Sequence, residues 1–202
     1  MNEGNKNVSG LREALVRFHK LWDQARESEP WECDAMTLAT VSAQGQPRAR
    51  TVLLKQADES GFVFYTNYES RKGNDLATNP QAALCFFWRT LRRQITVEGT
   101  VRRLDAGVSD AYFAARPRLS QLSAWVSAQS RPLGSREELE ARMRELEAKY
   151  AGCKVPRPLH WGGLIREPDM IEFWAPDAGR LNTRERYVQD IGGGWRCEWL
   201  NP

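Results

Sequence analysis

Histidine is almost absent from this chain of 202 residues, and its cysteines are few and scattered. The two histidines, His19 and His160, lie far apart in the sequence. The four cysteines form no Cys-x-x-Cys pair; they are Cys33, Cys85, Cys153 and Cys197. A zinc site needs clustered cysteine and histidine ligands, and a Ser-His-Asp or Cys-His hydrolase needs an imidazole. We therefore expect reduced thiols, no metal and neither of these hydrolase mechanisms.

Long apolar runs are missing as well. No segment approaches the roughly 20 apolar residues that a membrane-spanning helix needs. The N-terminal segment MNEGNKNVSG is polar and lacks the apolar core of a secretory signal. These absences predict a cytoplasmic protein without a membrane segment. The hydrophobic share of 41% and the charged share of 27% are ordinary for a globular chain, and the length suits one domain.

Glycine-rich nucleotide motifs are also lacking: no GxGxxG follows a predicted strand, and no GxxxxGKS/T occurs. Any bound phosphate must therefore be held mainly by side chains. The net charge of +3 is too small to indicate a nucleic-acid-binding protein. Most of the 29 basic residues are arginines, which suit bidentate contact with phosphate or carboxylate. A genome rich in G and C would also raise the arginine content. The positions of the arginines must therefore show whether they form an anion-binding site.

Apolar periodicity predicts the order of helices and strands along the chain. The first part is a helix, a hairpin and a third strand, at 9–29, 36–43, 48–55 and 61–67. The middle part is a short helix, two strands and three helices, at 69–80, 82–88, 92–104, 108–117, 120–130 and 135–150. Ser135 and Glu138 form the capping box that begins the last of these helices. Three closing strands are predicted at 162–176, 179–190 and 192–200.

Seven or eight strands joined mostly by short links favour a mainly β fold, an antiparallel barrel with peripheral helices. No internal repeat, low-complexity tract or linker divides the sequence. We therefore expect a single domain over 1–202, with an N-terminal helix within 1–30 and a barrel with helical insertions over 31–202.

Basic and polar side chains gather at two predicted strand ends in the first half of the chain. Arg50 and Lys55 lie on a strand so apolar that it must be at least half buried. These cations therefore need anionic partners, either a bound anion or Asp and Glu side chains. Tyr65 precedes Arg71 and Lys72 at a helix start, where backbone N–H groups favour an anion. The alternative for this second group is a solvated polar loop.

Two further groups combine cations with aromatic or hydroxyl side chains. The third group comprises Tyr112, Arg116 and Ser120. It offers donors to a phosphate, unless it is a basic loop on the surface. In the fourth group, Trp174 lies near Arg180 and Arg184 on neighbouring predicted strands, an aromatic wall beside cations. An ordinary barrel exterior is the alternative there.

Each group is a weak signal alone, but their order and spacing together resemble the pyridoxamine 5′-phosphate oxidase family. The similarity covers about residues 36–202. Seven segments carry it in order: RTVLLK (50–55), FYTNYESRKGNDLATNP (64–80), RRQITVEG (92–99), YFAARPRLSQLSAWVSAQS (112–130), WGG (161–163), IEFW (171–174) and RLNTR (180–184). The resemblance implies an FMN-binding split β-barrel, a homodimer, and one FMN at each of two sites between the subunits.

The resemblance also assigns FMN contacts to residues in most of these segments. They are Arg50, Thr51, Val52, Leu53, Leu54, Lys55, Tyr65, Thr66, Arg71, Lys72, Gln94, Gln129, Ser130, Trp174 and Arg184. Within this set, Arg71 and Lys72 would neutralise the FMN phosphate, with Arg50 close by. Gln94 and Gln129 would hydrogen-bond the edges of the flavin.

The implied activity is oxidation of pyridoxamine or pyridoxine 5′-phosphate to pyridoxal 5′-phosphate. Dioxygen would accept the electrons and give hydrogen peroxide, with ammonia released from the amine. The resemblance assigns the substrate phosphate to Lys55, Tyr112, Arg116 and Ser120. It places Arg180 over the substrate ring, and Arg180 and Asn182 are the candidate catalytic residues. The cofactor supplies the chemistry, so no strong general base is required, in agreement with the scarcity of histidine.

Two features depart from the family's pattern. Asn182 stands where the RLHxR motif of the family has histidine, and an amide can hydrogen-bond a ring hydroxyl but cannot carry a proton. The polar segment 1–10 does not resemble the basic, tyrosine-bearing arm that covers the substrate in many relatives. Two alternatives therefore stay open. One is an FMN oxidase of the same fold acting in secondary metabolism of the phenazine type, and the other is a flavin- or vitamer-binding protein without turnover.

Overall fold

One antiparallel sheet of nine strands with peripheral helices forms residues 9–202, the part of the protein that this computed structural model describes. The elements are α1 (Ser9–Ser28), β1 (Ala35–Val41), β2 (Pro47–Leu53), β3 (Gln56–Asp58), β4 (Gly61–Asn67), α2 (Arg71–Thr78), β5 (Gln81–Trp88), β6 (Arg93–Arg103), α3 (Ala106–Ala115), α4 (Arg118–Val126), α5 (Arg136–Lys149), β7 (Trp161–Ala175), η1 (Ala178–Arg180), β8 (Thr183–Gln189) and β9 (Trp195–Trp199). The expectation that no substrate-covering arm lies within 1–10 concerns residues that are almost all outside this described part.

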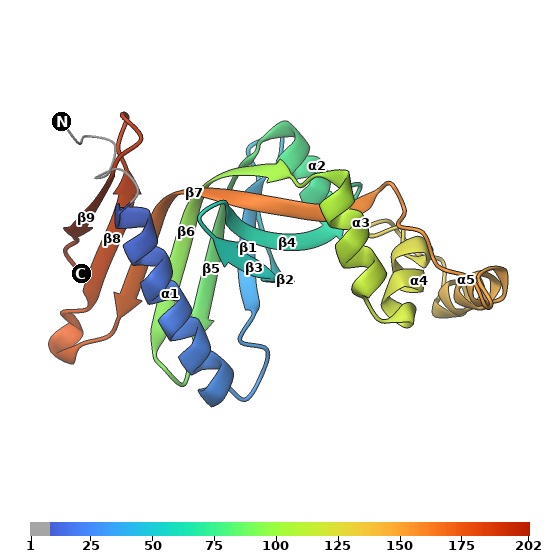
Figure 1. Cartoon of the computed structure of the whole chain (residues 1–202), viewed down its shortest axis with the longest axis horizontal. Coiled ribbons are helices and arrows are strands. Elements are labelled where there is room, and N and C mark those ends of the chain that lie inside the picture. Colours follow the sequence, from blue (N-terminus) through green and yellow to red (C-terminus); the bar gives the residue numbers. More distant parts are fainter. Residues whose placement is uncertain (1–8) are drawn as a thin grey trace.

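The strands run in the order β2-β1-β5-β6-β7-β4-β3, and β8 and β9 continue the sheet beyond β7 (Figure 1). The predicted hairpin is β1 and β2, paired antiparallel from Ala35↔Leu53 to Val41↔Pro47. Its turn holds Gly45 at φ 77°, which glycine adopts without strain. The expected mainly β, antiparallel fold with peripheral helices is confirmed.

The longest strand, β7, connects the two halves of the sheet. It pairs with β4 along 161–166 and with β8 along 170–175, while β6 pairs with it on the other side. Figure 1 shows β7 running from the helices α3–α5 at one end of the molecule to β8 and β9 at the other. Side chains at the two ends of β7 therefore belong to different parts of the surface.

A buried arginine lies at the point where the pairing of β7 changes from β4 to β8. The Arg166 side chain is fully buried and donates to the carbonyl oxygens of Ala82, at 2.6 Å, and Glu167, at 3.0 Å. The register of β6 and β7 shifts at Gly99, where Asp169 is an extra residue of β7. Glycine at position 99 leaves room for the guanidinium, because a Cβ atom there would lie 2.3 Å from Arg166 Nη1. The guanidinium thus ties β5 to β7 at the branch point.

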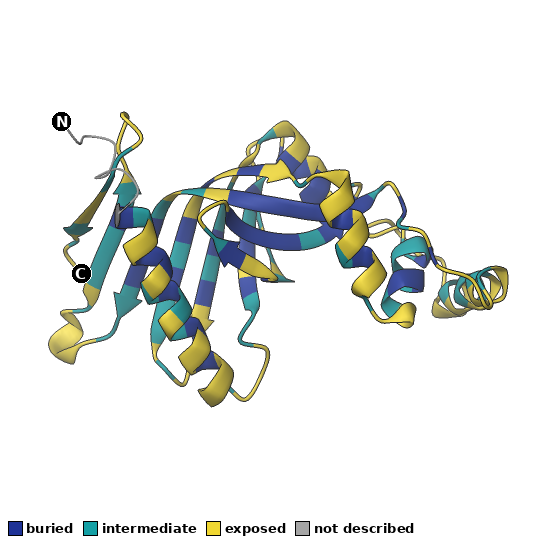
Figure 2. Ribbon diagram, in the orientation of Figure 1, coloured by how far each residue is buried: buried dark blue, intermediate teal, exposed yellow. Residues whose placement is uncertain are grey.

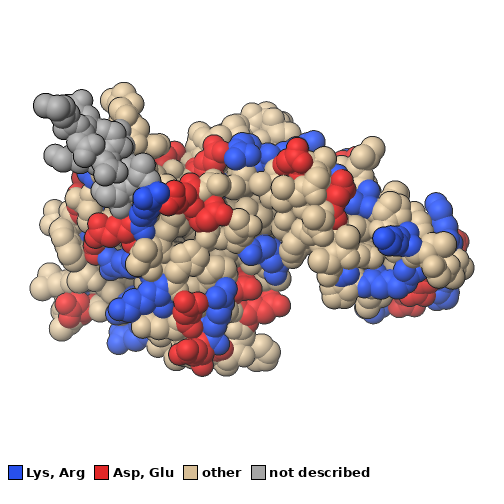
Figure 3. All heavy atoms as spheres, viewed as in Figure 1, with Lys and Arg blue, Asp and Glu red and all other residues tan. Residues whose placement is uncertain are grey.

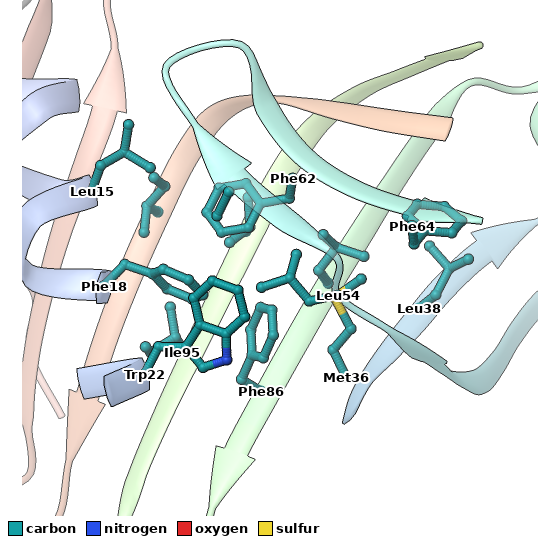
Figure 4. Packing of buried hydrophobic residues seen from close by; sticks show 14 of the residues in the cluster. Leu15, Phe18, Trp22, Met36, Leu38, Leu54, Phe62, Phe64, Phe86 and Ile95 are labelled. Carbon is teal, nitrogen blue, oxygen red and sulfur yellow. The ribbon is translucent and has the colours of Figure 1, made fainter. Parts of the chain in front are cut away.

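Aromatic side chains from α1 and the inner face of the sheet form the main core. Phe18 is fully buried, and its ring centroid lies 5.0 Å from that of Phe62 and 5.3 Å from that of Phe86. Figure 4 shows Leu15, Phe18 and Trp22 pointing from α1 toward the strands. The buried stripe of α1 faces the sheet and its exposed stripe faces away (Figure 2).

The helices α3, α4 and α5 form a lobe at the end of the sheet far from β8 and β9 (Figure 1). A smaller core joins them to the barrel; its buried members are Phe113, Leu122, Val155 and Trp161. Because Trp161 is the first residue of β7, the lobe is packed directly on the start of that strand. None of the residues of α5 is buried, and this helix packs mainly on α4.

Two local expectations were wrong. No strand is predicted between residues 55 and 61, yet residues 56–58 form the short strand β3, which pairs with β4. The segment 179–182, expected to begin a strand, is the turn η1 and irregular chain, so β8 starts only at Thr183. The Asp177 carboxylate caps this turn by accepting from the Ala178 N–H at 2.6 Å, and Gly179 has φ 64°. The chain therefore leaves the extended conformation before Arg180.

Charged side chains of both signs are interspersed over the surface seen in Figure 3. Some form exposed pairs, as Arg12 does with Glu59 at 2.6 Å and Arg136 with Glu140 at 3.0 Å. Within residues 9–202, no helix is both long and apolar enough to cross a membrane.

Candidate functional site

A first cavity of about 460 Å³ lies where β2 and β4 meet α3 and α4. It brings together ten of the residues predicted to bind cofactor or substrate. They are Thr51, Val52, Leu53, Lys55, Tyr65, Thr66, Lys72, Tyr112, Arg116 and Gln129. Alternation along β2 explains part of this grouping, because Thr51 and Leu53 point to one face of the strand.

A second cavity of about 610 Å³ adjoins the first at the start of α2. Thr51, Lys72 and Gln129 line both cavities, so the two are continuous. The second cavity adds three predicted residues, Arg50, Arg71 and Ser130, and two that were not predicted, Arg48 and Ala49.

Among residues 9–202, six basic side chains and no acidic one line the two cavities. They are Arg48, Arg50, Lys55, Arg71, Lys72 and Arg116. Salt bridges within residues 9–202 involve only two of them, Arg48 and Arg50. Cations held this close repel one another in a partly desolvated site, so the cavities favour an anionic ligand.

One buried carboxylate, that of Asp75 in α2, lies behind the second cavity. It is 4% exposed and lies 2.6 Å from Arg48 Nη1 and 3.7 Å from Arg50 Nη2. Thr40 Oγ1 donates to it at 2.8 Å, and Arg50 Nη1 contacts that hydroxyl at 2.8 Å and donates to the Leu38 carbonyl at 3.0 Å. Asp75 therefore fixes both guanidinium groups at the cavity edge.

Lys72, in the first turn of α2, is buried where its neighbours are polar but uncharged. Its Nζ donates to Ser70 Oγ at 3.1 Å and to Gln129 Oε1 at 2.8 Å. Ser70 also caps α2 by accepting from the Gly73 N–H at 3.3 Å. Burial, and to a lesser extent the charge of Arg50, lowers the pKa of Lys72 to about 8. An anion bound at this helix start would offset both effects.

Stacked aromatic rings form a wall of the first cavity. The rings of Tyr65 and Tyr112 are 3.7 Å apart and 9° from parallel, and Trp161 lies 5.4 Å from Tyr65. Arg116 Cζ lies 4.4 Å from the centroid of Trp161, and its buried Nη1 has no hydrogen-bond partner within residues 9–202. Burial lowers the pKa of Arg116 and raises the pKa values of both tyrosines. A buried N–H without an acceptor is costly, so Arg116 is oriented for an anion.

The donor set therefore suits planar, phosphorylated molecules. Guanidinium and ammonium groups match phosphate oxygens, and the aromatic wall offers a flat surface to a ring. The FMN that the resemblance implies fits these residues, because its phosphate would supply the negative charge that the second cavity lacks.

Three predicted residues form a separate group on the other half of the sheet, here called the second cluster: Gln94, Trp174 and Arg184. Trp174 lies directly opposite Gln94 of β6 and Arg184 of β8. Arg184 donates to both carboxylate oxygens of Glu172, at 2.8 and 3.0 Å. Along β7, Trp174 and the cavity residue Trp161 are separated by on the order of 40 Å of extended chain.

The other predicted residues also lie outside the cavities of a single chain. Arg180 is exposed in the turn η1, and Asn182 Oδ1 accepts from the Asp177 N–H at 3.3 Å. Ser120 does not line the first cavity, where Ser123 of the same helix does. Leu54 is fully buried in the main core. One chain therefore brings together most of the predicted cofactor residues but not the predicted catalytic pair.

The second cluster and the first cavity lie on the same outer face of the sheet. Strand register places Thr51, Thr37, Cys85, Thr96 and Glu172 in one row across β2, β1, β5, β6 and β7. Residues directly opposite each other point to the same face, and four strand spacings amount to about 20 Å. Trp174 lies two residues beyond Glu172 and shares this face.

Arg48, Asp75 and Trp161 are among the site residues to which the sequence motifs assigned no role. A signal for Asp75 was present at Thr40, which continues the buried positions Met36 and Leu38 of β1 with a polar side chain. A hydroxyl on an apolar face needs a hydrogen-bond partner, and Asp75 supplies it. The sequence could not identify Asp75 as that partner, because α2 and β1 come into contact only in the folded chain.

Known proteins resemble this chain over nearly its whole length. Residues 21–150 match the family described as "Pyridoxamine 5'-phosphate oxidase", and residues 161–202 match "Pyridoxine 5'-phosphate oxidase C-terminal dimerisation region". A pyridoxine/pyridoxamine 5′-phosphate oxidase of Bordetella petrii is 52% identical, covering 92% of this chain and 88% of its own length. One from Myxococcus xanthus is 50% identical, with coverages of 93% and 91%.

Solved structures show the same architecture. PhzG from Burkholderia lata 383, in complex with tetrahydrophenazine-1-carboxylic acid, superposes with a TM-score of 0.85 at 31% identity, covering 100% of this chain and 95% of its own. A pyridoxamine 5′-phosphate oxidase-related, FMN-binding protein from Nostoc punctiforme gives 0.74 at 17% identity, with coverages of 93% and 96%. The fold is thus an FMN-binding split barrel.

Replacing Asp75 with asparagine should lower the free energy of unfolding by about 3 kcal/mol, because two partly buried guanidinium groups lose their carboxylate. Urea denaturation measures this, with Glu59→Gln as the control, since loss of that exposed pair should cost less than 1 kcal/mol. Added inorganic phosphate should stabilise Asp75→Asn more than the unsubstituted protein, because it restores the missing negative charge. Equal stability, or equal gain from phosphate, would contradict the assigned role.

Proposed function

The chain belongs to the pyridoxamine 5′-phosphate oxidase family of FMN-dependent oxidoreductases, and from that premise we propose that it makes pyridoxal 5′-phosphate. Pyridoxamine 5′-phosphate, dioxygen and water would give the aldehyde, ammonia and hydrogen peroxide. Pyridoxine 5′-phosphate and dioxygen would give the aldehyde and hydrogen peroxide. The observation that carries the proposal is the pair of continuous cavities, which six cations and no acidic side chain of residues 9–202 line.

Each cavity has donors for one phosphate. In the second, Arg50, Arg71 and Lys72 would hold the FMN phosphate at the start of α2. Arg48, which points to the same cavity, adds a further donor. In the first, Lys55 and Arg116 would hold the substrate phosphate, with the Tyr112 hydroxyl beside them. Two phosphates held by separate sets of cations would fix the two planar rings relative to each other.

The role of the protein is binding and orientation. When bound, FMN supplies the redox chemistry, accepting a hydride from the substrate carbon and passing electrons to dioxygen. In the described part of the chain, no histidine, aspartate or glutamate lines either cavity, so the side chains that do line them act as hydrogen-bond donors and cations. Gln129, which lines both cavities, would hydrogen-bond the flavin edge once it leaves Lys72. The stacked wall of Tyr65, Tyr112 and Trp161 shields one side of the first cavity from water.

A homodimer would complete the site, because the second cluster lies too far from the cavities of its own chain. The dimerisation region of the family match, 161–202, contains Trp174 and Arg184. The cluster and the first cavity lie at opposite sides of one sheet face. A two-fold axis through that face would bring the cluster of each subunit to the cavity of its partner. Gln94, Trp174 and Arg184 would then contact FMN across the interface.

Arg180 and Asn182 would approach the substrate ring in the same way, because they lie just beyond the second cluster. Asn182 would hydrogen-bond the ring hydroxyl through its amide. Ser120 would add to the phosphate site from α4. We place the enzyme in the cytoplasm; its four cysteines are all free thiols, as a reducing compartment maintains them.

A second candidate substrate class is supported by the PhzG structure, which aligns with the whole chain at 31% identity. A tetrahydrophenazine carboxylic acid offers a carboxylate to the cations of the first cavity. It has no phosphate, however, and would leave part of the set formed by Lys55, Tyr112 and Arg116 without a partner. The phosphorylated vitamers use these donors better.

Purified protein incubated with FMN and then with pyridoxamine 5′-phosphate under air should form pyridoxal 5′-phosphate and peroxide in equal amounts. Absorbance follows the aldehyde, and a peroxidase-coupled dye follows the peroxide. A yellow protein that oxidises tetrahydrophenazine-1-carboxylic acid instead would favour the second candidate. A yellow protein inert toward both would favour a binding protein. Failure to bind FMN at all would overturn the proposal.

Mixing two inactive variants should restore activity if each site is built from two subunits. Arg116→Met removes a cavity donor, and Arg184→Met removes a residue of the second cluster. Subunits refolded together at equal amounts should show about a quarter of the unsubstituted activity, since half the dimers are mixed and each has one intact site. The control mixture, Arg116→Met with Lys55→Met, has both changes in the same cavity and should stay inactive. Recovery in neither mixture would place the site within one subunit.

The affinity for FMN should fall by about tenfold between pH 7 and pH 9. Lys72 has a pKa of about 8 in the free protein, so below that pH it carries the charge that binds phosphate. A bound phosphate raises this pKa, and affinity is therefore lost as the pH rises through the free value. The phosphate itself is already a dianion, with a second pKa of about 6. Fluorescence titration of FMN measures the effect, and Lys72→Met should bind more weakly with a flat profile.

A further inference from the structure

The Arg116 guanidinium stacks on Trp161 of the first cavity, and its backbone belongs to the junction between α3 and α4. Arg116 is the C-cap residue that follows α3, and Pro117 is the N-cap residue that precedes α4. Its N–H makes a single contact, with the Phe113 carbonyl at 3.2 Å. Pro117 offers α4 no side-chain cap. A junction of this kind needs support from elsewhere to hold a side chain at a fixed point.

Two side chains of α4 supply that support from opposite sides. Gln121 is buried, and its Nε2 donates to the last carbonyls of α3, those of Phe113 at 3.0 Å and Ala114 at 3.1 Å. Arg118 donates through Nη2 to the Tyr150 carbonyl at 2.6 Å and through Nη1 to the Cys153 carbonyl at 3.0 Å. These two acceptors belong to the C-terminal end of α5 and the turn after it.

Through these contacts with Arg118, the C-terminal end of α5 supports the junction between α3 and α4. The helix has no buried residue, and none of its side chains lines either cavity. Its last carbonyls carry partial negative charge, which favours a cation such as Arg118. Because Arg118 lies two residues after Arg116, a fixed Arg118 restricts where the Arg116 side chain can point.

We infer that Arg118 and Gln121 are positioning residues for the substrate phosphate, acting through Arg116, and that α5 is the anchor for Arg118. This rests on the proposed function, in which Arg116 binds the substrate phosphate. Neither residue lines either cavity, and both side chains are bonded to backbone carbonyls instead. On this inference, the affinity for phosphate depends on the contacts of Arg118 with the Tyr150 and Cys153 carbonyls.

The test compares Arg118→Met, which keeps the length of the side chain but removes its donors, with Arg136→Met on the exposed face of α5. Arg118→Met should raise the KM for pyridoxamine 5′-phosphate roughly tenfold, within the range that a misplaced group can cost. The kcat at saturation and the affinity for FMN should stay within twofold. The KM for pyridoxamine, which has no phosphate, should not change. Arg136→Met should match the unsubstituted protein in every measurement.

A readout independent of turnover is the affinity for inorganic phosphate, measured by calorimetry on FMN-loaded protein. Arg116→Met should lose most of it, and Arg118→Met and Gln121→Met should lose about tenfold. Arg118→Lys should bind as weakly as Arg118→Met, because one ammonium cannot bridge the two carbonyls as a planar guanidinium does. Full affinity in Arg118→Lys would show that charge alone matters and would overturn the inference.

The outcomes separate this inference from the function on which it rests. Phosphate affinity lost in Arg116→Met but unchanged in Arg118→Met and Gln121→Met would leave the phosphate site standing and reject the positioning role. Unchanged affinity in Arg116→Met would reject both. A lower melting temperature in Arg118→Met with unchanged phosphate affinity would mean that Arg118 only stabilises the fold.

Discussion

Like charges held close together constrain the whole of this site. Six basic side chains surround two continuous cavities, and the only carboxylate that contacts them within residues 9–202 is that of Asp75, which lies behind them. Folding must therefore supply the free energy that holds the cations near one another and partly out of water. A ligand phosphate returns part of this free energy on binding. The repulsion among these cations destabilises the free protein, and a bound phosphate stabilises the protein at the same place.

The rest of the architecture serves this constraint by restricting movement. Arg50 is on a strand whose register is fixed along seven residue pairs, and Lys72 is in a helix turn capped by Ser70. Arg116 stacks on Trp161, the first residue of β7. Cations fixed to strands and capped turns cannot move apart to relieve their repulsion, so the repulsion is relieved by a ligand instead.

The fold and the main cations could be predicted from the sequence because their signals are local. Alternating apolar residues predicted β1, β2, β4 and β6 to within a few residues, and the ordered motifs pointed to Lys55, Lys72 and Arg116. Asp75 could not be predicted, since its partner Thr40 is 35 positions away. The turn at 179–182 was mistaken for strand because its cause, the Asp177 cap with Gly179 at φ 64°, is short and resembles ordinary loop sequence. Gln94, Trp174 and Arg184 lie apart from the cavities within one chain, and the order of the motifs along the sequence does not indicate this separation.

Both halves of the site lie on β7, so their relative orientation depends on the number of residues between them. Trp161 lies at the first cavity and Trp174 on the outer face at the second cluster, both on one uninterrupted strand. Deleting one residue between them would turn every later side chain of β7 to the opposite face, so that Trp174 would enter the core and Phe173 would face outward. The side of the sheet on which Trp174 lies therefore depends also on Asp169, the one extra residue of β7 where its register with β6 shifts.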